Sequence, residues 1–157
     1  MQSKPQAMIL GTGRAVPEKI LSNSDLEQMV ATTDDWIVTR TGIRQRHVAA
    51  PGSPLSDLAA EAARSALADA GVAAEEIDLI ILGTVTGDMK FPATACLVQE
   101  KIGARNAAAF DLAAACSGFI YGLQVAAGMM AVAGYRRVLV IGGEILTSMV
   151  NWQDRDT

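Results

Sequence analysis

Residues 107–119 read Ala107-Ala-Ala-Phe-Asp-Leu-Ala-Ala-Ala-Cys-Ser-Gly-Phe119, and this stretch decides the fold. Its first half is a strand-like run that ends near Leu112, and its second half opens a helix-like run from Ser117 to Ala133. Cys116 lies at the junction between them. A thiol at a helix N-terminus faces unpaired backbone N–H groups and the positive end of the helix dipole, and both favour the nucleophilic thiolate. The junction therefore predicts a candidate covalent catalyst at the end of a strand.

Strand-like and helix-like runs alternate on both sides of this junction. The stretches Ile77–Val85 and Arg137–Ile141 are almost continuously apolar, which is typical of strands covered on both faces. Helix-like runs extend from Ser56 to Ala70 and from Pro92 to Ile102. This alternation predicts an α/β fold with a mostly parallel sheet, right-handed crossovers and a buried central helix over residues 117–133.

The N-terminal third of the chain carries shorter signals. Met8–Gly13 is a short apolar run that ends in Gly-Thr-Gly, so we expect a strand there. Ser22 and Asp25 have the spacing of a capping box and open a helix. Thr33 begins a second short helix, which Gly42 ends. These elements precede the alternating part of the chain.

Composition narrows the class of protein. The chain has 157 residues, half of them apolar, which is enough for one ordinary domain with a sizeable core. Its net charge is −4, and no basic stripe is available to neutralise phosphates, so we expect no nucleic-acid partner. Two cysteines and one histidine predict neither a metal site nor a disulfide framework. Residues 1–7 lack the apolar core of a signal peptide, and we expect a cytoplasmic protein.

An uncharged run over residues 112–135 raises the question of a membrane span. It is long enough to cross a bilayer and contains the Gly118-x-x-x-Gly122 spacing found in membrane helix pairs. However, it is rich in Ala and Gly, which are less lipophilic than Leu or Phe, and it includes Ser117 and Gln124. A helix that is apolar all round is also what the centre of a large soluble fold requires. We therefore expect no membrane, and a non-catalytic membrane or interaction protein stays open as the alternative.

The chemistry of Cys116 has two interpretations. Buried structural cysteines are common, so the thiol by itself is not decisive. A strand-to-helix junction is where α/β proteins place their sites, and the small neighbours Ala113–Ala115 leave room for a substrate and an oxyanion hole of backbone N–H groups. The single histidine, His47, and the second cysteine, Cys96, are interpreted as structural.

Trp36 and Arg40 lie one helical turn apart and therefore project from the same face. An indole beside a guanidinium suits stacking on a nucleotide base and pairing with phosphate. The alternative is a Trp that packs locally beside a solvated Arg.

Four motifs carry a resemblance to a known family. They are Thr33-Asp-Asp-Trp-Ile-Val-Thr-Arg-Thr-Gly-Ile-Arg-Gln-Arg-His47, Phe91-Pro-Ala-Thr-Ala-Cys96, Phe110-Asp-Leu-Ala-Ala-Ala-Cys-Ser-Gly-Phe119 and Asp154-Arg-Asp-Thr157. In order and in spacing they resemble β-ketoacyl-acyl-carrier-protein synthase III over essentially the whole chain. The resemblance implies a thiolase-like fold of two similar halves, of which residues 1–157 match the N-terminal half.

The same resemblance implies an activity and a set of site residues. Family members condense an acyl-CoA primer with malonyl-acyl carrier protein and so start fatty-acid synthesis. We expect acetyl-CoA as the primer here, with acyl-CoA as a substrate and no cofactor. It implies a nucleophile, a coenzyme A site and an acyl pocket shared across a homodimer. The matching positions are Cys116 as the nucleophile; Trp36 and Arg155 around the adenine, Thr32 near it and Arg40 at the phosphates; and Phe91 and Leu146 at the acyl pocket.

The family's catalytic His and Asn belong to the second half and are not in these 157 residues. We therefore expect that the chain alone does not catalyse condensation. A polyketide-priming acyltransferase or ketosynthase of the same fold stays open as an alternative, because few residues that select the primer are visible here.

Overall fold

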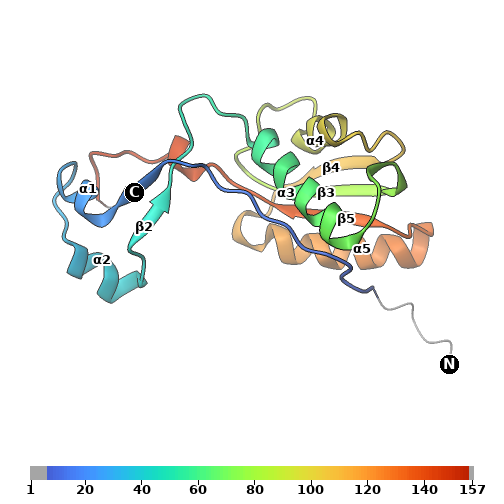
Figure 1. Cartoon of the computed structure of the whole chain (residues 1–157), viewed down its shortest axis with the longest axis horizontal. Helices are drawn as coiled ribbons and strands as arrows, with labels where there is room; N and C mark the ends of the chain where they lie inside the picture. The colour runs from blue at the N-terminus through green and yellow to red at the C-terminus, as the bar shows by residue number, and fades with distance from the viewer. Residues whose placement is uncertain (1–6, 156–157) are drawn as a thin grey trace. The chain divides into compact units, whose positions relative to one another are not determined.

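The computed structural model describes residues 7–155. The absence of a signal peptide was inferred partly from residues 1–6, which lie outside the described residues, as do the last two residues of the motif 154–157. Two compact units divide the described chain (Figure 1). We call them the sheet unit, residues 7–15 and 54–144, and the small unit, residues 16–53 and 145–155. Each unit is described by itself.

A parallel sheet of three strands forms the centre of the sheet unit. Strand β3 (Leu79–Gly83) lies between β4 (Ala108–Leu112) and β5 (Val138–Gly142). Leu79 is in register with Ala108 on one side and with Val138 on the other. Every residue of β3 is buried, as its unbroken apolar sequence predicts. The predicted α/β class, its parallel strands and their places in the chain are confirmed.

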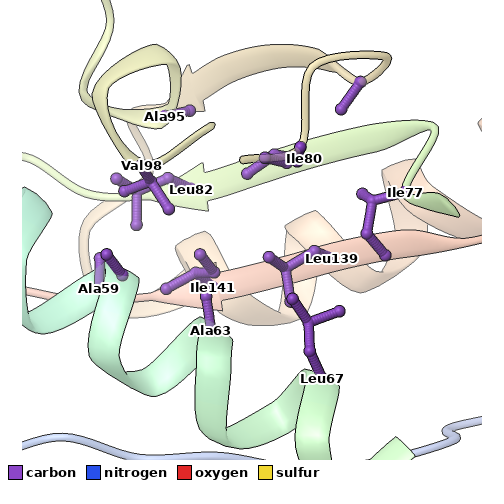
Figure 2. Packing of buried hydrophobic residues seen from close by; sticks show 13 residues of the cluster. Ala59, Ala63, Leu67, Ile77, Ile80, Leu82, Ala95, Val98, Leu139 and Ile141 are labelled. Carbon is purple, nitrogen blue, oxygen red and sulfur yellow. The ribbon is translucent and has the colours of Figure 1, made fainter. Parts of the chain in front are cut away.

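Helices cover both faces of this sheet. Helices α3 (Leu55–Ala70) and α4 (Thr94–Ile102) lie on one face, and α5 (Gly118–Ala133) lies on the other (Figure 1). Successive β3 residues alternate between the two sides: Ile80 and Leu82 pack with the α3 and α4 side chains, whereas Leu79 and Ile81 pack with α5. Figure 2 shows the first cluster, where small α3 residues let the helix approach β5 closely. Each fully buried Leu or Ile contributes roughly 1.5–3 kcal/mol to folding.

Carboxylates from elsewhere in the chain cap two of these helices. The backbone N–H of Ser56, the second residue of α3, donates to the Asp88 carboxylate at 3.1 Å. The backbone N–H groups of Thr94 and Ala95 both donate to Asp111 at 2.7 Å, which caps α4 from strand β4. Long-range caps of this kind satisfy helix donors that local sequence leaves open.

Helix α5 is covered on one side only. Its buried residues are Gly118, Gly122 and Ala126, and the backbone at Gly122 comes so close to Val140 that a Cβ would lie 2.9 Å from that side chain. The opposite side exposes large apolar residues, so within the described residues the predicted central helix is buried on its sheet side only. Among the described residues, Ala115–Ala133 is the stretch long and apolar enough to cross a membrane, and 17% of it is buried. Core helices of soluble proteins meet the same criterion, so length and composition do not distinguish a membrane span from a core helix.

The segment Met8–Gly13, predicted as a strand, pairs with no strand among the described residues. It runs along α3 instead. A Cβ at Gly11 would lie 2.5 Å from the backbone nitrogen of Ala70, and one at Gly13 would lie 2.2 Å from the carbonyl oxygen of Ala62. These two glycines therefore allow a backbone-to-helix contact that any side chain would block. The predicted strand is therefore wrong: the segment contacts a helix through its glycines, and Met8, Ile9 and Leu10 are exposed.

The small unit consists of short elements. Strands β1 (Ile20–Ser22) and β2 (Gln45–His47) pair antiparallel, and helices α1 (Asn23–Glu27) and α2 (Asp34–Thr41) follow β1. The predicted capping box of Ser22 and Asp25, the Thr33 cap and the left-handed Gly42 are all present. Asn23 is buried at the centre, where it donates to Asp34 at 2.7 Å and accepts from Arg46 at 2.9 Å.

Candidate functional site

Cys116 lies on a tight turn between strand β4 and helix α5. The turn is the 3₁₀ segment Ala115–Ser117, and the Cys116 side chain is exposed. Ala115, directly before the cysteine, has φ of +45°, a left-handed conformation that costs a residue with a Cβ about 1–2 kcal/mol. Strand β4 before the turn and helix α5 after it hold the turn between them. The sequence-predicted nucleophile is therefore presented to solvent on a strained turn.

The start of α5 rests directly on the carboxyl ends of two strands. A Cβ at Gly83, the last residue of β3, would lie 2.8 Å from the carbonyl carbon of Gly118. A Cβ at Gly142, the last residue of β5, would lie 3.0 Å from the Cβ of Phe119. These contacts leave no space for adjustment, because the facing atoms are backbone or Cβ. The carboxyl ends of parallel strands thus place Cys116 where α/β proteins carry their sites.

The N-terminus of α5 can stabilise negative charge beside the thiol. The helix is 16 residues long, and no side chain caps its first backbone N–H groups. Such an end favours an anion, both a thiolate and the oxyanion that forms when a thiolate attacks a thioester. The arrangement suits covalent acyl transfer through Cys116.

Phe91, the residue predicted at the acyl pocket, stands out on the loop between β3 and α4. Its side chain is 87% exposed, an unusual state for a large aromatic residue. Leu146, its predicted companion, lies in the short 3₁₀ segment Leu146–Ser148 of the small unit and is 55% exposed. The two residues belong to different units, and their predicted shared role stays a prediction.

The small unit brings together the residues predicted to bind coenzyme A. The guanidinium carbon of Arg40 lies 4.4 Å from the centre of the Trp36 ring, and that of Arg155 lies 4.9 Å from it. Both distances are within the range of cation–π attraction. Arg155 also donates to the Ala31 carbonyl at 3.3 Å. Residues separated by 115 to 119 positions in sequence thus meet at one indole.

Next to this indole is a pocket of about 190 Å³. Thr32, Trp36 and Arg155 line it, and the Thr32 hydroxyl is buried with no hydrogen-bond partner. An unpaired buried hydroxyl costs about 1–3 kcal/mol, so a ligand that bonds it would recover that cost. The predicted contact of Thr32 with the ligand is therefore chemically reasonable, although it stays a prediction.

Insertion of a base between Trp36 and Arg155 requires movement. Two stacked layers need about 7 Å, twice the optimal carbon–carbon separation of ~3.5 Å, whereas the present separation is 4.9 Å. Arg155 is the mobile partner, because its side chain is long and flexible, whereas Trp36 lies in helix α2. In this structure Arg155 stacks directly on Trp36, and we expect a bound base to take the place of this contact.

Several pocket residues were missed in the sequence. Arg46 reaches the pocket from β2, and burial lowers the pKa of its guanidinium below its ordinary value. Asn151, Trp152 and Asp154 also line it. Trp152 lies three residues before Arg155, and its nearness in sequence to a predicted site residue could have marked it as a pocket residue. Among residues 7–155, no group of three or more His, Cys, Asp or Glu residues is placed to hold a metal ion.

Comparisons with known proteins show which sequences this chain is similar to. The family model for 3-oxoacyl-[acyl-carrier-protein (ACP)] synthase III matches residues 110–157. Proteins named β-ketoacyl-[acyl-carrier-protein] synthase III are 58% identical over 149 residues in Desulfitobacterium hafniense and 56% identical over 157 residues in Caldanaerobacter subterraneus subsp. tengcongensis. These matches cover 95% and 100% of this chain but 45% and 47% of the relatives.

Solved structures give the same result for the fold. The Aquifex aeolicus 3-oxoacyl-[acyl-carrier-protein] synthase III superimposes with a TM-score of 0.91 at 48% identity, covering 95% of this chain and 48% of that one. The priming β-ketosynthase of the R1128 polyketide pathway gives 0.89 at 38% identity, covering 94% and 44%. The chain spans about half the length of the relatives that it matches. Over nearly its whole length the chain therefore resembles the β-ketoacyl-acyl-carrier-protein synthase III family, and it has that family's thiolase-like α/β fold.

Proposed function

We propose that the full-length protein containing residues 1–157 condenses an acyl-CoA primer, most simply acetyl-CoA, with malonyl-acyl carrier protein. The observation that carries this proposal is Cys116, exposed on a strained turn at the uncapped N-terminus of α5. A thiolate there attacks the thioester carbonyl, the C–S bond to coenzyme A breaks, and the acyl group is held on Cys116 while coenzyme A leaves with a proton.

The second half-reaction transfers this acyl group to carbon. The malonyl group loses CO₂, the resulting carbanion forms a C–C bond to the acyl carbonyl, and the thioester to Cys116 breaks and regenerates the thiolate. The His and Asn that the family uses for this step lie outside the chain, so its residues supply the nucleophile and the oxyanion site. We expect residues 1–157 alone to be acylated slowly at most and not to release a condensed product.

The small-unit pocket is our proposed coenzyme A site. Its support is the stack of Arg40 and Arg155 on Trp36 and the unpaired hydroxyl of Thr32. An adenine would insert between Trp36 and Arg155, and the Arg40 guanidinium would meet the phosphates. We further propose a cytoplasmic homodimer in which Phe91 reaches the partner's acyl pocket, since an 87% exposed Phe suggests an apolar surface that receives it.

A test of the proposal measures product formation by the full-length protein from labelled acetyl-CoA and malonyl-acyl carrier protein. We expect a labelled β-ketoacyl product that disappears in Cys116→Ala. Cys96→Ala is the matched control, since this second free cysteine is partly buried on α4. Product formation that survives Cys116→Ala and is lost in Cys96→Ala would overturn the assignment.

Primer choice is the point on which a second candidate function differs. The likeness to a polyketide priming ketosynthase, with a TM-score of 0.89, supports a protein that starts polyketide chains with the same acyl-cysteine chemistry. Competition between acetyl-CoA and longer acyl-CoA primers in the same assay separates the two, because a preference for the longer primer favours the second candidate.

A further inference from the structure

The loop that presents Phe91 is held by carboxylates from both neighbouring strands. It begins at Thr84, directly after the central strand β3, and ends at Ala93, where helix α4 begins. Glu144 follows β5 on one side of β3, and Asp111 lies in β4 on the other. All of these residues belong to the sheet unit. The loop Thr84–Ala93 is therefore anchored at both ends.

Glu144 anchors the start of the loop with both carboxylate oxygens. Its Oε1 accepts the backbone N–H of Val85 at 2.9 Å. Its Oε2 accepts the backbone N–H of Thr86 at 3.0 Å, the Thr84 hydroxyl at 3.1 Å and the Thr86 hydroxyl. Four donors on three consecutive residues define the path of the backbone there, because hydrogen bonds to a charged acceptor are the strong ones.

Asp111 anchors the end of the loop. Its two oxygens accept the backbone N–H groups of Thr94 and Ala95, both at 2.7 Å. The fully buried Thr94 hydroxyl in turn accepts the backbone N–H of Asp88 at 3.0 Å, which ties the middle of the loop to the same point. Phe91 lies between these anchors and makes no hydrogen bond of its own through its side chain, so its position depends on them.

We propose that Glu144 and Asp111 are positioning residues that hold the Phe91 loop in one place, and that this fixed placement sets which acyl chain lengths the protein accepts. The second clause rests on the proposed function, because it assumes that Phe91 lines an acyl pocket. A rigid pocket wall can reject a primer that is longer by a few methylene groups. One extra methylene in an apolar pocket changes kcat/KM by about 10–200-fold. A wall on a mobile loop yields and discriminates less.

The variant Glu144→Gln tests the anchor with little change in size. An amide has one acceptor oxygen, so it can serve Val85 or Thr86 but not both backbone N–H groups. Amide hydrogen exchange should therefore show protection falling about tenfold at one of these two residues. Protection of Ile80 and Ile81 in β3 should stay high and report that the fold is intact. Glu61→Gln, on the exposed face of α3, is the matched control and should change neither.

Asp111→Asn separates the two anchors. Protection should fall at Thr94 or Ala95 and not at Val85 or Thr86. If neither variant lowers the protection of its own pair, the anchoring is wrong. This measurement needs no substrate, so it is independent of the proposed function.

Acyl selectivity tests the second clause in the full-length protein. Acylation of Cys116 is compared for acetyl-CoA and octanoyl-CoA, with alkylation by iodoacetamide as a measure of the thiol itself. We expect Glu144→Gln to lower the ratio of the two acylation rates about tenfold while alkylation stays unchanged. Lost protection with an unchanged ratio would overturn the role in selectivity. If the unsubstituted protein is not acylated at all, the proposed function fails and the selectivity clause fails with it, whereas the exchange result at the anchors stands.

Discussion

The turn at Cys116 and the pocket at Trp36 achieve their geometry by different means. Around Cys116 the backbone sets the position: Gly83 and Gly118 are in contact without side chains, and Ala115 is held in a left-handed conformation. Around Trp36, long flexible side chains from Arg40 and Arg155 provide the stacking. The first region should tolerate no added volume, whereas the second should tolerate movement and depend on its aromatic face. A nucleophile needs a fixed position, and a site that opens for a base needs a mobile one.

The largest expected effect comes from adding one methyl group below Cys116. Gly83→Ala should lower the free energy of unfolding by about 3 kcal/mol, since its Cβ would meet the α5 backbone at 2.8 Å and neither side can yield. Urea denaturation measures this change. Gly128→Ala, in the helix α5 against which Gly83 packs, is the control, because nothing lies within 4 Å of a Cβ built there. The control should be stabilised by about 1 kcal/mol. Equal behaviour of the two variants would break the contrast.

Removal of the indole tests the other side of the contrast. Trp36→Ala should weaken binding of coenzyme A by about 30-fold, equivalent to ~2 kcal/mol of lost stacking, with little change in unfolding free energy. Calorimetric titration of the full-length protein provides the measurement. Trp36→Phe should recover part of the affinity because it keeps an aromatic face. Unchanged affinity in Trp36→Ala would place the coenzyme elsewhere.

A smaller effect should follow relief of the strain before the nucleophile. Ala115→Gly should raise the free energy of unfolding by about 0.5–1 kcal/mol, because glycine adopts a φ of +45° without steric cost. The same change should slow acylation of Cys116, since the turn becomes free to adopt other conformations. A destabilised Ala115→Gly protein would show that the left-handed turn is not strained.

The smallest effect concerns Asp78, which directly precedes β3 and so lies at the amino end of the strand, away from Cys116. The pKa of Asp78 lies below its ordinary value of 3.8, mainly because its carboxylate accepts the backbone N–H of Arg137 and also that of Arg136, at 2.9 and 2.8 Å. A carboxyl whose pKa is lower in the folded state adds stability above its ordinary pKa and loses it as the pH falls through the folded value. Thermal unfolding below pH 4 should therefore become less pH-dependent in Asp78→Asn, whereas Glu61→Gln should behave as the unsubstituted protein does.

Local signals in the sequence were sufficient for most of the elements. The unbroken apolar runs gave the three strands, and the capping box at Ser22 and the cap at Thr33 gave the starts of α1 and α2. Cys116 could be found because its strand-to-helix junction is local. Each of these depends on neighbouring residues alone, and the structure confirms the elements and the junction, whereas the role of Cys116 stays a prediction.

Features that depend on a distant partner could not be read in the same way. The apolar pattern of Met8–Gly13 does not reveal that the segment runs along α3 and does not pair as a strand. The uncharged run over residues 117–133 predicts a buried central helix, but not which side of it the sheet of this chain covers. The role of Glu144 could not be predicted, because its hydrogen-bond partners, Thr84–Thr86, lie about sixty positions earlier in the chain. The pocket residues of the small unit come from both ends of the chain for the same reason.

The most direct test of the central claim, that Cys116 is the acyl-accepting nucleophile, is intact-mass analysis after mixing the full-length protein with acetyl-CoA, without malonyl-acyl carrier protein. We predict one acetyl group per chain, located by peptide mapping on the peptide that carries Cys116, absent in Cys116→Ala and retained in Cys96→Ala. An adduct on Cys96, or one that persists in Cys116→Ala, would contradict the claim.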